Sequence, residues 1–152
     1  LGADVPFCLE TGCRLARGIG EKLTPAPHLP PCGILVIKPR YSISTKSLFQ
    51  KMGAGPLQQR PDTQAMLRAL EGGDLEKIGA NLRNVMEPVA CALHPQEQEL
   101  REKLLAEKAL GARMTGSGSV LYGLFENTQQ AEKAAEAFRK LPVETFVCTP
   151  VF

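Results

Sequence analysis

The chain has 152 residues, of which 43% are hydrophobic, so it is long enough to bury one full core. Its formal net charge is only +2 and it has no basic stripe interleaved with aromatics, which argues against a nucleic-acid or membrane partner. No apolar run reaches the roughly 20 residues that span a bilayer. The five cysteines are scattered without a Cys-x-x-Cys pair, so we expect reduced thiols in a cytoplasmic protein and no zinc site.

The first part of the chain is predicted to be a unit apart from the rest. Residues 13–17 have the composition of a short strand, and residues 18–21 are predicted to turn the chain. Residues 25–31 contain four prolines, a composition that excludes a helix interior or a central strand. We therefore predict an extended linker there, with domains at 1–31 and 32–152.

A strand and a short helix are predicted next. Residues 33–39 form a continuous β-branched run that ends at a proline, which indicates a strand buried on both faces. A helical pattern follows, and either Ser44 or Thr45 can accept a hydrogen bond from its first free N–H groups. Three apolar residues lie on one side of this helix: Leu48, Phe49 and Met52.

Three more helices are predicted before the chain returns to strands. Asp62 and Asp74 each begin one, and Pro88 is expected to interrupt the second. The clearest helix covers residues 95–110, with proline in its first turn and Gly111 after its end.

Residues 111–125 are predicted to form two strands joined by a short Thr-Gly-Ser-Gly-Ser centre. Glycine supplies the positive φ values that a tight reversal needs. A loop of small residues also leaves successive main-chain N–H groups uncovered, and these can form a concavity for anions. On these residues alone, a plain hairpin turn and an anion-binding loop are both open.

A last helix capped by Thr128 and a strand over residues 143–148 complete the chain. From residue 33 onward, the predicted order is strand, several helices, hairpin, helix, strand. This order predicts an α+β, ferredoxin-like domain of β-α-β-β-α-β type with extra helices in the first crossover.

Two stretches together carry a resemblance to a known family. Leu-Gly-Ala-Asp-Val-Pro-Phe at residues 1–7 resembles the aspartate-bearing segment of the 4-diphosphocytidyl-2-C-methyl-D-erythritol kinase family, within the GHMP kinase superfamily. Residues 112–119 resemble the third motif of that superfamily, its carboxy-terminal glycine loop. Residues 16–21 and 39–45 also fall in the family's order, so the resemblance covers essentially the whole chain. Residues 1–7 are its specific part, because the glycine loop alone indicates only the superfamily.

The resemblance implies an ATP-dependent kinase, using ATP with Mg, that phosphorylates the tertiary hydroxyl of a small-molecule substrate carrying a cytidine diphosphate group. The family's amino-terminal half, with the main ATP-phosphate loop and the catalytic lysine, has no counterpart in these 152 residues. We therefore expect residues 1–31 to be the remnant of the amino-terminal catalytic domain and a linker, and residues 32–152 to be the GHMP kinase carboxy-terminal domain. The chain alone is expected to be inactive, and its residues 1–23 can pair between copies.

The resemblance also implies roles for individual residues. Asp4 is the implied catalytic residue, which takes or orients the proton of the substrate hydroxyl. The hydroxyl of Thr45 would lie near the transferred phosphoryl group, and Phe49 would stack on the cytosine ring. The implied phosphate- or substrate-binding residues of the glycine loop are Thr115, Gly116, Ser117, Gly118 and Ser119. No residue is predicted to be a metal ligand.

Each of these assignments has a structural alternative. Asp4 can cap the turn before Pro6, Thr45 can be a helix N-cap, and Phe49 can be a core residue beside Leu48. Two other functions also stay open at this point. One is a non-catalytic ferredoxin-like module for small-molecule binding or assembly, and the other is a GHMP kinase with a different acceptor.

Overall fold

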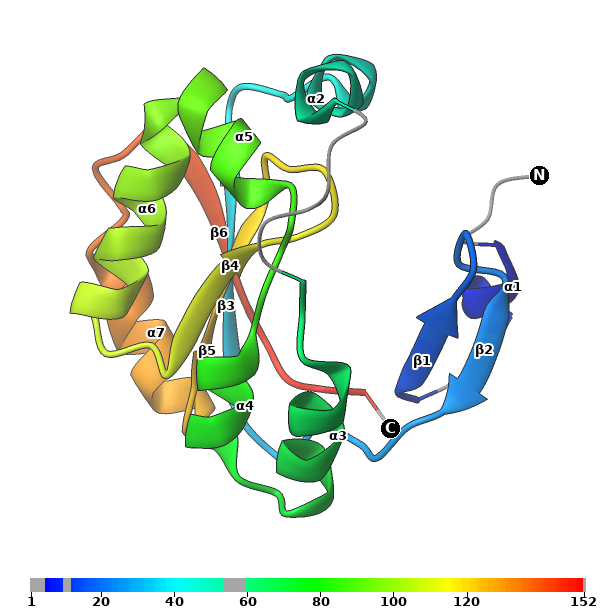
Figure 1. Cartoon of the computed structure of the whole chain (residues 1–152). Coiled ribbons are helices and arrows are strands. Elements are labelled where there is room, and N and C mark those ends of the chain that lie inside the picture. The colour runs from blue at the N-terminus through cyan, green and yellow to red at the C-terminus, as the bar shows by residue number, and fades with distance from the viewer. Residues whose placement is uncertain (1–4, 10–11, 54–59, 152) are drawn as a thin grey trace.

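The structure of the protein, a computed structural model, describes residues 5–9, 12–53 and 60–151. Its centre is a four-stranded sheet with the order β4-β5-β3-β6, in which every neighbouring pair is antiparallel (Figure 1). The strands are β3 (Gly33–Pro39), β4 (Gly111–Met114), β5 (Leu121–Phe125) and β6 (Val143–Cys148). The predicted α+β, ferredoxin-like fold is thereby confirmed, and the first and third of these strands lie side by side at the centre.

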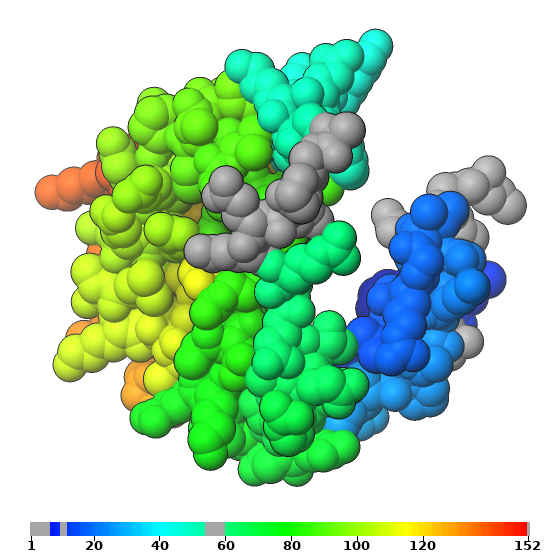
Figure 2. All heavy atoms as spheres, in the orientation of Figure 1, coloured from blue at the N-terminus to red at the C-terminus, as the bar shows by residue number. Residues whose placement is uncertain are grey.

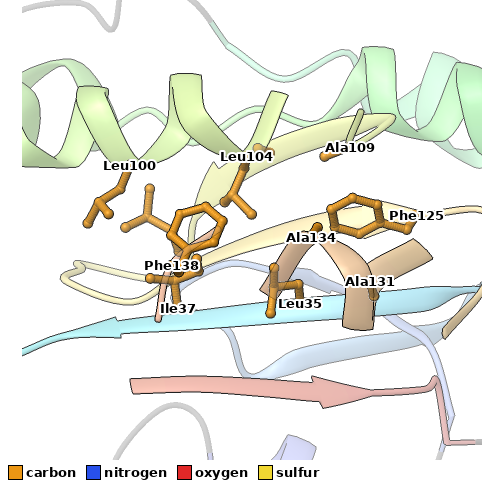
Figure 3. Close-up of a cluster of buried hydrophobic side chains, with 11 residues drawn as sticks. Leu35, Ile37, Leu100, Leu104, Ala109, Phe125, Ala131, Ala134 and Phe138 are labelled. Atoms are coloured by element: carbon orange, nitrogen blue, oxygen red, sulfur yellow. The ribbon is translucent and has the colours of Figure 1, made fainter. Parts of the chain in front are cut away.

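Two helices cover one face of this sheet and form the main core with it. They are α6 (Pro95–Ala106) and α7 (Thr128–Glu136), and Figure 3 shows their side chains meeting those of the central strands. Leu35 and Ile37 of β3 point to this face together with Phe125 of β5. Full burial of a side chain of this size contributes about 1.5–3 kcal/mol, so this cluster stabilises the sheet that carries the rest.

The opposite face is covered in part by α3 (Thr63–Glu71) and α4 (Leu75–Asn81). Successive residues of a strand point to opposite faces, so Ile34 of β3 packs with these helices while Leu35 does not. The prediction that β3 is buried on both faces was too strong, because Ile34 and Val36 are only half-buried.

α4 crosses β4 with its backbone almost in contact with the strand, at a pair of glycines. A Cβ built on Gly79 would lie 2.3 Å from the Leu110 carbonyl oxygen, and one on Gly111 would lie 2.5 Å from the Gly79 oxygen. Both distances are far below a van der Waals contact. The close approach therefore depends on the absence of a side chain at both positions.

Two further helices lie at the end of the sheet where β4 passes into β5. They are α2 (Thr45–Met52) and α5 (Glu87–Leu93), and both pack around Met114, the last residue of β4. The sequence analysis did not predict α5, because it treated Pro88 as a break. Pro88 instead lies in the first turn of the helix, where no intrahelical N–H bond is lost.

The predicted helix boundaries are confirmed at some ends and wrong at others. Asp62 and Asp74 cap α3 and α4, as expected. Asn127 caps α7 in place of Thr128, and accepts from the N–H of Gln130. α6 ends at Ala106 rather than at residue 110, because the chain reverses at Lys108, whose φ is +69°.

The N-terminal part of the described chain forms its own small unit. It contains α1 (Val5–Cys8) and an antiparallel pair of strands, β1 (Arg14–Arg17) and β2 (Lys22–Pro25). This unit lies to one side of the main sheet (Figures 1 and 2). The sequence analysis predicted β1 and the turn but not β2, because it assigned Pro25 to the linker. On an edge of a two-stranded ribbon, a proline loses no ladder bond.

The described residues contain no metal-ligand cluster, no membrane-spanning helix and no disulfide bond. They contain no group of three or more His, Cys, Asp or Glu residues that could hold a metal ion. No helix among them is both long and apolar enough to cross a membrane. All five cysteines are free, and burial raises the pKa of the Cys32 thiol.

Candidate functional site

The loop that joins β4 to β5, residues 115–120, is called the glycine loop here. It is a tight reversal, in which the N–H of Thr115 donates to Val120 O at 2.8 Å and that of Gly118 to Thr115 O at 3.0 Å. Gly116 and Gly118 have φ values of +55° and +84°, which residues with a Cβ rarely adopt. The predicted hairpin is confirmed.

Within residues 116–119 of the glycine loop, three main-chain donors have no acceptor among the described residues. No described residue accepts a hydrogen bond from the N–H of Gly116, Ser117 or Ser119. Thr115 and Gly116 are exposed, and Ser117 is half-buried. Successive free N–H groups in a turn with left-handed residues form a concave site for an anion. The geometry therefore suits a phosphate oxygen.

Asn84 holds the base of the glycine loop from a distant part of the chain. Its Nδ2 donates to Met114 O at 2.8 Å and to Gly116 O at 2.9 Å, while its Oδ1 accepts from Met86 N at 2.9 Å. One amide side chain thus ties the end of β4 to the first glycine of the loop. The sequence analysis did not identify Asn84, because nothing local to residue 84 indicates a contact 32 residues away.

Glu87 anchors the same strand end with a buried carboxylate. It accepts from the N–H of Met114 at 3.0 Å and from Arg101 Nη1 at 3.0 Å, and Arg113 Nε lies 3.7 Å away. A buried carboxylate is stable only when it is paired and hydrogen-bonded, and here it is both. Burial lowers the pKa of Arg113, and the nearby Glu87 opposes that shift. The sequence analysis did not identify Glu87, although a charged residue beside the apolar run of α5 was a usable signal.

Helix α2 brings a second set of predicted residues to the loop. The hydroxyl oxygens of Thr45 and Ser117 lie 2.7 Å apart and share a hydrogen bond. Ser44, not Thr45, is the N-cap and accepts from Ser47 N at 3.3 Å, so the hydroxyl of Thr45 is not used to cap the helix. Phe49 is 56% exposed, whereas the adjacent Leu48 is fully buried. The structural alternatives for Thr45 and Phe49, helix cap and core residue, therefore do not describe this structure.

Ser119 differs from the other loop residues, because its side chain is buried and already has a partner. Its hydroxyl donates to the carbonyl oxygen of Tyr41 at 2.6 Å, which leaves its main-chain N–H as the free donor. The phenol of Tyr41 in turn donates to Glu97 Oε1 at 2.9 Å. Burial raises the pKa of Glu97 to about 7, and Glu97 Oε2 has no partner among the described residues.

Most of the predicted site residues lie together, on the glycine loop and on α2. Thr45 contacts the glycine loop directly, and Phe49 lies one helical turn further along α2. Asp4 lies outside the described residues, so its assignment stays a prediction.

Comparison with known proteins decides the family. The profile described as GHMP kinases C terminal matches residues 66–143, which is just over half of the chain and includes the whole glycine loop. The chain belongs to the GHMP kinase C-terminal family. The resemblance inferred from residues 112–119 is thereby confirmed.

Relatives of this GHMP kinase domain share one name. The protein called 4-diphosphocytidyl-2-C-methyl-D-erythritol kinase in Lachnoclostridium phytofermentans is 39% identical over 93% of the chain. Its namesake in Caldicellulosiruptor saccharolyticus is 38% identical over 98% of the chain. The crystal structure of a 4-(cytidine 5'-diphospho)-2C-methyl-D-erythritol kinase superposes with a TM-score of 0.80 at 34% identity, covering 97% of this chain and 53% of its own.

The chain spans about half the length of the curated relatives it matches, 49% of the first and 51% of the second. A homoserine kinase from Cytophaga hutchinsonii has a TM-score of 0.71 over 97% of this chain and 50% of its own, but at 21% identity that likeness shows the fold alone. The fold, the matching family profile and the kinase names of the relatives are thus consistent with one another.

Proposed function

We propose that this chain is the carboxy-terminal part of an ATP-dependent kinase that phosphorylates the tertiary hydroxyl of 4-diphosphocytidyl-2-C-methyl-D-erythritol. In support, relatives that bear the name of this kinase match more than nine-tenths of the chain at 38–39% identity. On this proposal, residues 1–31 are the end of the amino-terminal catalytic domain with its linker, and residues 32–152 are the carboxy-terminal domain.

The observation that carries the proposal is the combination at the glycine loop. Three main-chain N–H groups within residues 116–119 have no acceptor in the part of the chain that the structure describes, and they lie on the loop whose Ser117 hydroxyl is bonded to Thr45. Phosphoryl transfer requires little covalent chemistry from the protein, because its transition state is loose and mainly needs alignment and charge compensation. Uncovered N–H donors and hydroxyl groups supply that compensation for phosphate oxygens.

The remaining roles follow from the same proposal. Asp4 takes or orients the proton of the attacking hydroxyl, and Phe49 offers an exposed ring on which the cytosine of the substrate can stack. ATP is the phosphoryl donor. The described residues contain no cluster of ligands that fits Mg²⁺, so we assign no metal ligand and no catalytic step to that ion.

The first test uses the complete enzyme that the proposal implies. Asp4→Asn keeps the size of the side chain but loses the base, and a general base typically contributes about 10²–10⁴-fold in rate. We expect kcat to fall by that order with little change in nucleotide affinity. Unchanged turnover in steady-state assays would restore the turn-capping reading of Asp4.

A second test asks which acceptor is used and whether Phe49 recognises it. Stacking contributes roughly 1–3 kcal/mol per base, so Phe49→Leu should raise KM for the cytidine substrate while leaving the melting temperature nearly unchanged. An assay with homoserine and mevalonate as alternative acceptors distinguishes another GHMP kinase. Absence of turnover with every acceptor would favour a non-catalytic module.

A third test uses the chain as it stands. Without the main ATP-phosphate loop and the catalytic lysine of the family, we expect no kinase turnover and no measurable affinity for Mg-ATP. Isothermal titration of the 152-residue chain with Mg-ATP measures this directly. Tight nucleotide binding by the isolated chain would contradict the proposal that it is only the carboxy-terminal part of the kinase.

A further inference from the structure

A cavity of about 550 Å³ lies where β3 ends, and no residue of the glycine loop lines it. Its walls come from three segments: the end of β3 and the residues after it, the N-terminal half of α6, and the turn that leads into β6. The lining residues that the argument uses are Arg40, Tyr41, Leu100, Lys103, Leu141 and Val143. This volume is within the range of pockets that hold small molecules, about 300–1,000 Å³.

The walls of the cavity are mostly apolar and one of them is held in place. Leu100, Leu141 and Val143 provide aliphatic surface, and Leu141 remains 36% exposed. Tyr41 is held at two points, because its hydroxyl donates a hydrogen bond to Glu97 and its carbonyl oxygen accepts one from Ser119. It also stacks on His94 with ring centroids 5.0 Å apart. The cavity is therefore pre-formed and suits an apolar, ring-sized group.

Among the described residues, the charged side chains that line the cavity form no ion pair. In the described structure Glu99 and Lys103 form no ion pair, and Lys103 Nζ lies over the ring of Phe138, 5.5 Å from its centroid. No described residue forms a hydrogen bond or ion pair with Arg40. Two cations thus stand at the cavity against the single carboxylate of Glu99.

We propose that this cavity is a binding site for a small amphiphilic anion, with an apolar ring or branched chain inside and one carboxylate, sulfonate or phosphate held by Arg40 and Lys103. An apolar body alone would leave both cations without an anionic partner, and an inorganic anion alone would leave the aliphatic walls hydrated. The site is separate from the proposed phosphate-binding loop, because no residue of 115–120 lines it.

Tyr41 connects this site to the glycine loop. Tyr41 lines the cavity, and its carbonyl oxygen accepts a hydrogen bond from the hydroxyl of Ser119 at 2.6 Å. A ligand that displaces the main chain of Tyr41 also shifts this hydrogen bond. A ligand bound in the cavity should therefore alter the environment of Ser119 in the glycine loop. This coupling would allow the cavity to regulate the glycine loop.

The test is an NMR titration of the whole 152-residue chain, labelled with ¹⁵N, using naphthalene-1-sulfonate as probe. Amide shifts are expected at Tyr41, Leu100 and Val143, with smaller shifts at Ser119. The neutral isostere 1-naphthylmethanol should cause shifts at the same residues but bind more weakly. Lys103→Gln and Arg40→Gln should each weaken sulfonate binding by roughly two- to fivefold, the range for an exposed ion pair.

The matched control is Lys133→Gln, which removes an exposed lysine on α7 that does not line the cavity. Its affinity for the sulfonate should equal that of the unaltered chain. Leu141→Glu places a carboxylate at the cavity and should abolish sulfonate binding while the rest of the spectrum stays unchanged. Shifts confined to the exposed Phe49 or Phe146, or equal affinity for sulfonate and alcohol, would overturn the proposal.

Discussion

The glycine loop and the β1–β2 turn are built from the same local parts. Each reverses a pair of short antiparallel strands, and each uses two glycines with positive φ: Gly116 and Gly118 in the loop, Gly18 and Gly20 in the turn. Their surroundings differ. The β1–β2 turn is closed by its own residues, since Gly20 N donates to Arg17 O and Ile19 N to Glu21.

The glycine loop is held by side chains from distant parts of the chain. Asn84, Glu87 and Thr45 each bond the loop or the strand end before it, and Ser119 bonds Tyr41. A glycine-rich reversal alone therefore does not define a site. The glycine loop keeps one shape because remote polar groups fix it, whereas the β1–β2 turn depends on its own few residues.

The largest expected effect comes from Glu87→Ala. The substitution leaves Arg101 and Arg113 half-buried without their carboxylate, and Met114 N without an acceptor. Removing one partner of a buried ion pair costs about 3–5 kcal/mol in the free energy of unfolding. Urea denaturation measures this loss. Glu21→Ala in the β1–β2 turn is the control and should change that free energy by less than about 1 kcal/mol.

The next effect distinguishes the two glycines of the loop. A Cβ on Gly118 would lie 2.6 Å from Met114 Sδ and 2.9 Å from Ile43 Cδ1, whereas one on Gly116 would meet nothing within 4 Å. Left-handed backbone costs a residue with a Cβ about 1–2 kcal/mol, and overpacking adds about 1–3 kcal/mol. Gly118→Ala should therefore destabilise the chain by about 2–4 kcal/mol, and Gly116→Ala by about 1–2 kcal/mol.

Gly18→Ala is the counterpart of these variants in the β1–β2 turn. It has a φ of +71°, and an added Cβ would meet only the flexible end of Glu21. Thermal melting of the three variants should rank Gly118→Ala lowest. Equal melting temperatures for Gly116→Ala and Gly118→Ala would show that core contacts do not fix the loop.

A pH series tests the buried end of the Ser119–Tyr41–Glu97 chain. The carboxyl of Glu97 has a pKa of about 7 in the folded protein and 4.5 as its ordinary value, because burial disfavours its charge. The folded state therefore holds a proton that the unfolded state has lost between these values, so the free energy of unfolding falls as pH rises from about 4.5 to about 7.

Glu97→Gln, which cannot ionise, should lack this loss. The difference in free energy of unfolding between the unaltered chain and the variant should change by about 3 kcal/mol across that pH range. Denaturant titrations at several pH values measure it. Parallel curves for the two proteins would mean that Glu97 titrates normally.

The smallest effect is expected from removal of residues 1–25. The β1–β2 pair is stabilised by its own strands, and Leu9 and Ile19 within this part of the chain are 84% and 82% exposed. Little apolar surface is therefore lost to the sheet domain. The free energy of unfolding of residues 26–152 should differ from that of the whole chain by less than about 1 kcal/mol. A loss of cooperative unfolding would show that the two parts stabilise each other.

The elements that the sequence predicted well are those with local signals. β3, α3 and β6 have a β-branched run, an Asp cap and a proline boundary, and each signal lies within a few residues of the element it defines. α5 was missed because its stability comes from packing: Ala90 is fully buried against Met114 and Leu48. Tertiary packing therefore stabilises a helix at a place where Pro88, taken alone, predicts a break.

The candidate site divides in the same way. The glycine loop itself was predictable, because glycines between two strand-like segments are typical of a tight hairpin turn. The contact of Thr45 with Ser117 spans 72 residues, and that of Asn84 with Gly116 spans 32. Only the ferredoxin-like topology brings those segments to one end of the sheet. A single sequence shows the residue types but not this neighbourhood.

The crossing of α4 over β4 limits how this part of the protein can vary. Gly79 and Gly111 face one another, and the atoms that a new methyl group would strike are backbone atoms. A substitution at one position cannot be compensated by a smaller residue at the other, since that residue is already the smallest. Neither glycine can therefore be replaced while α4 stays at its present distance from β4. A homologue with a larger residue at either position must have the whole helix further from the strand.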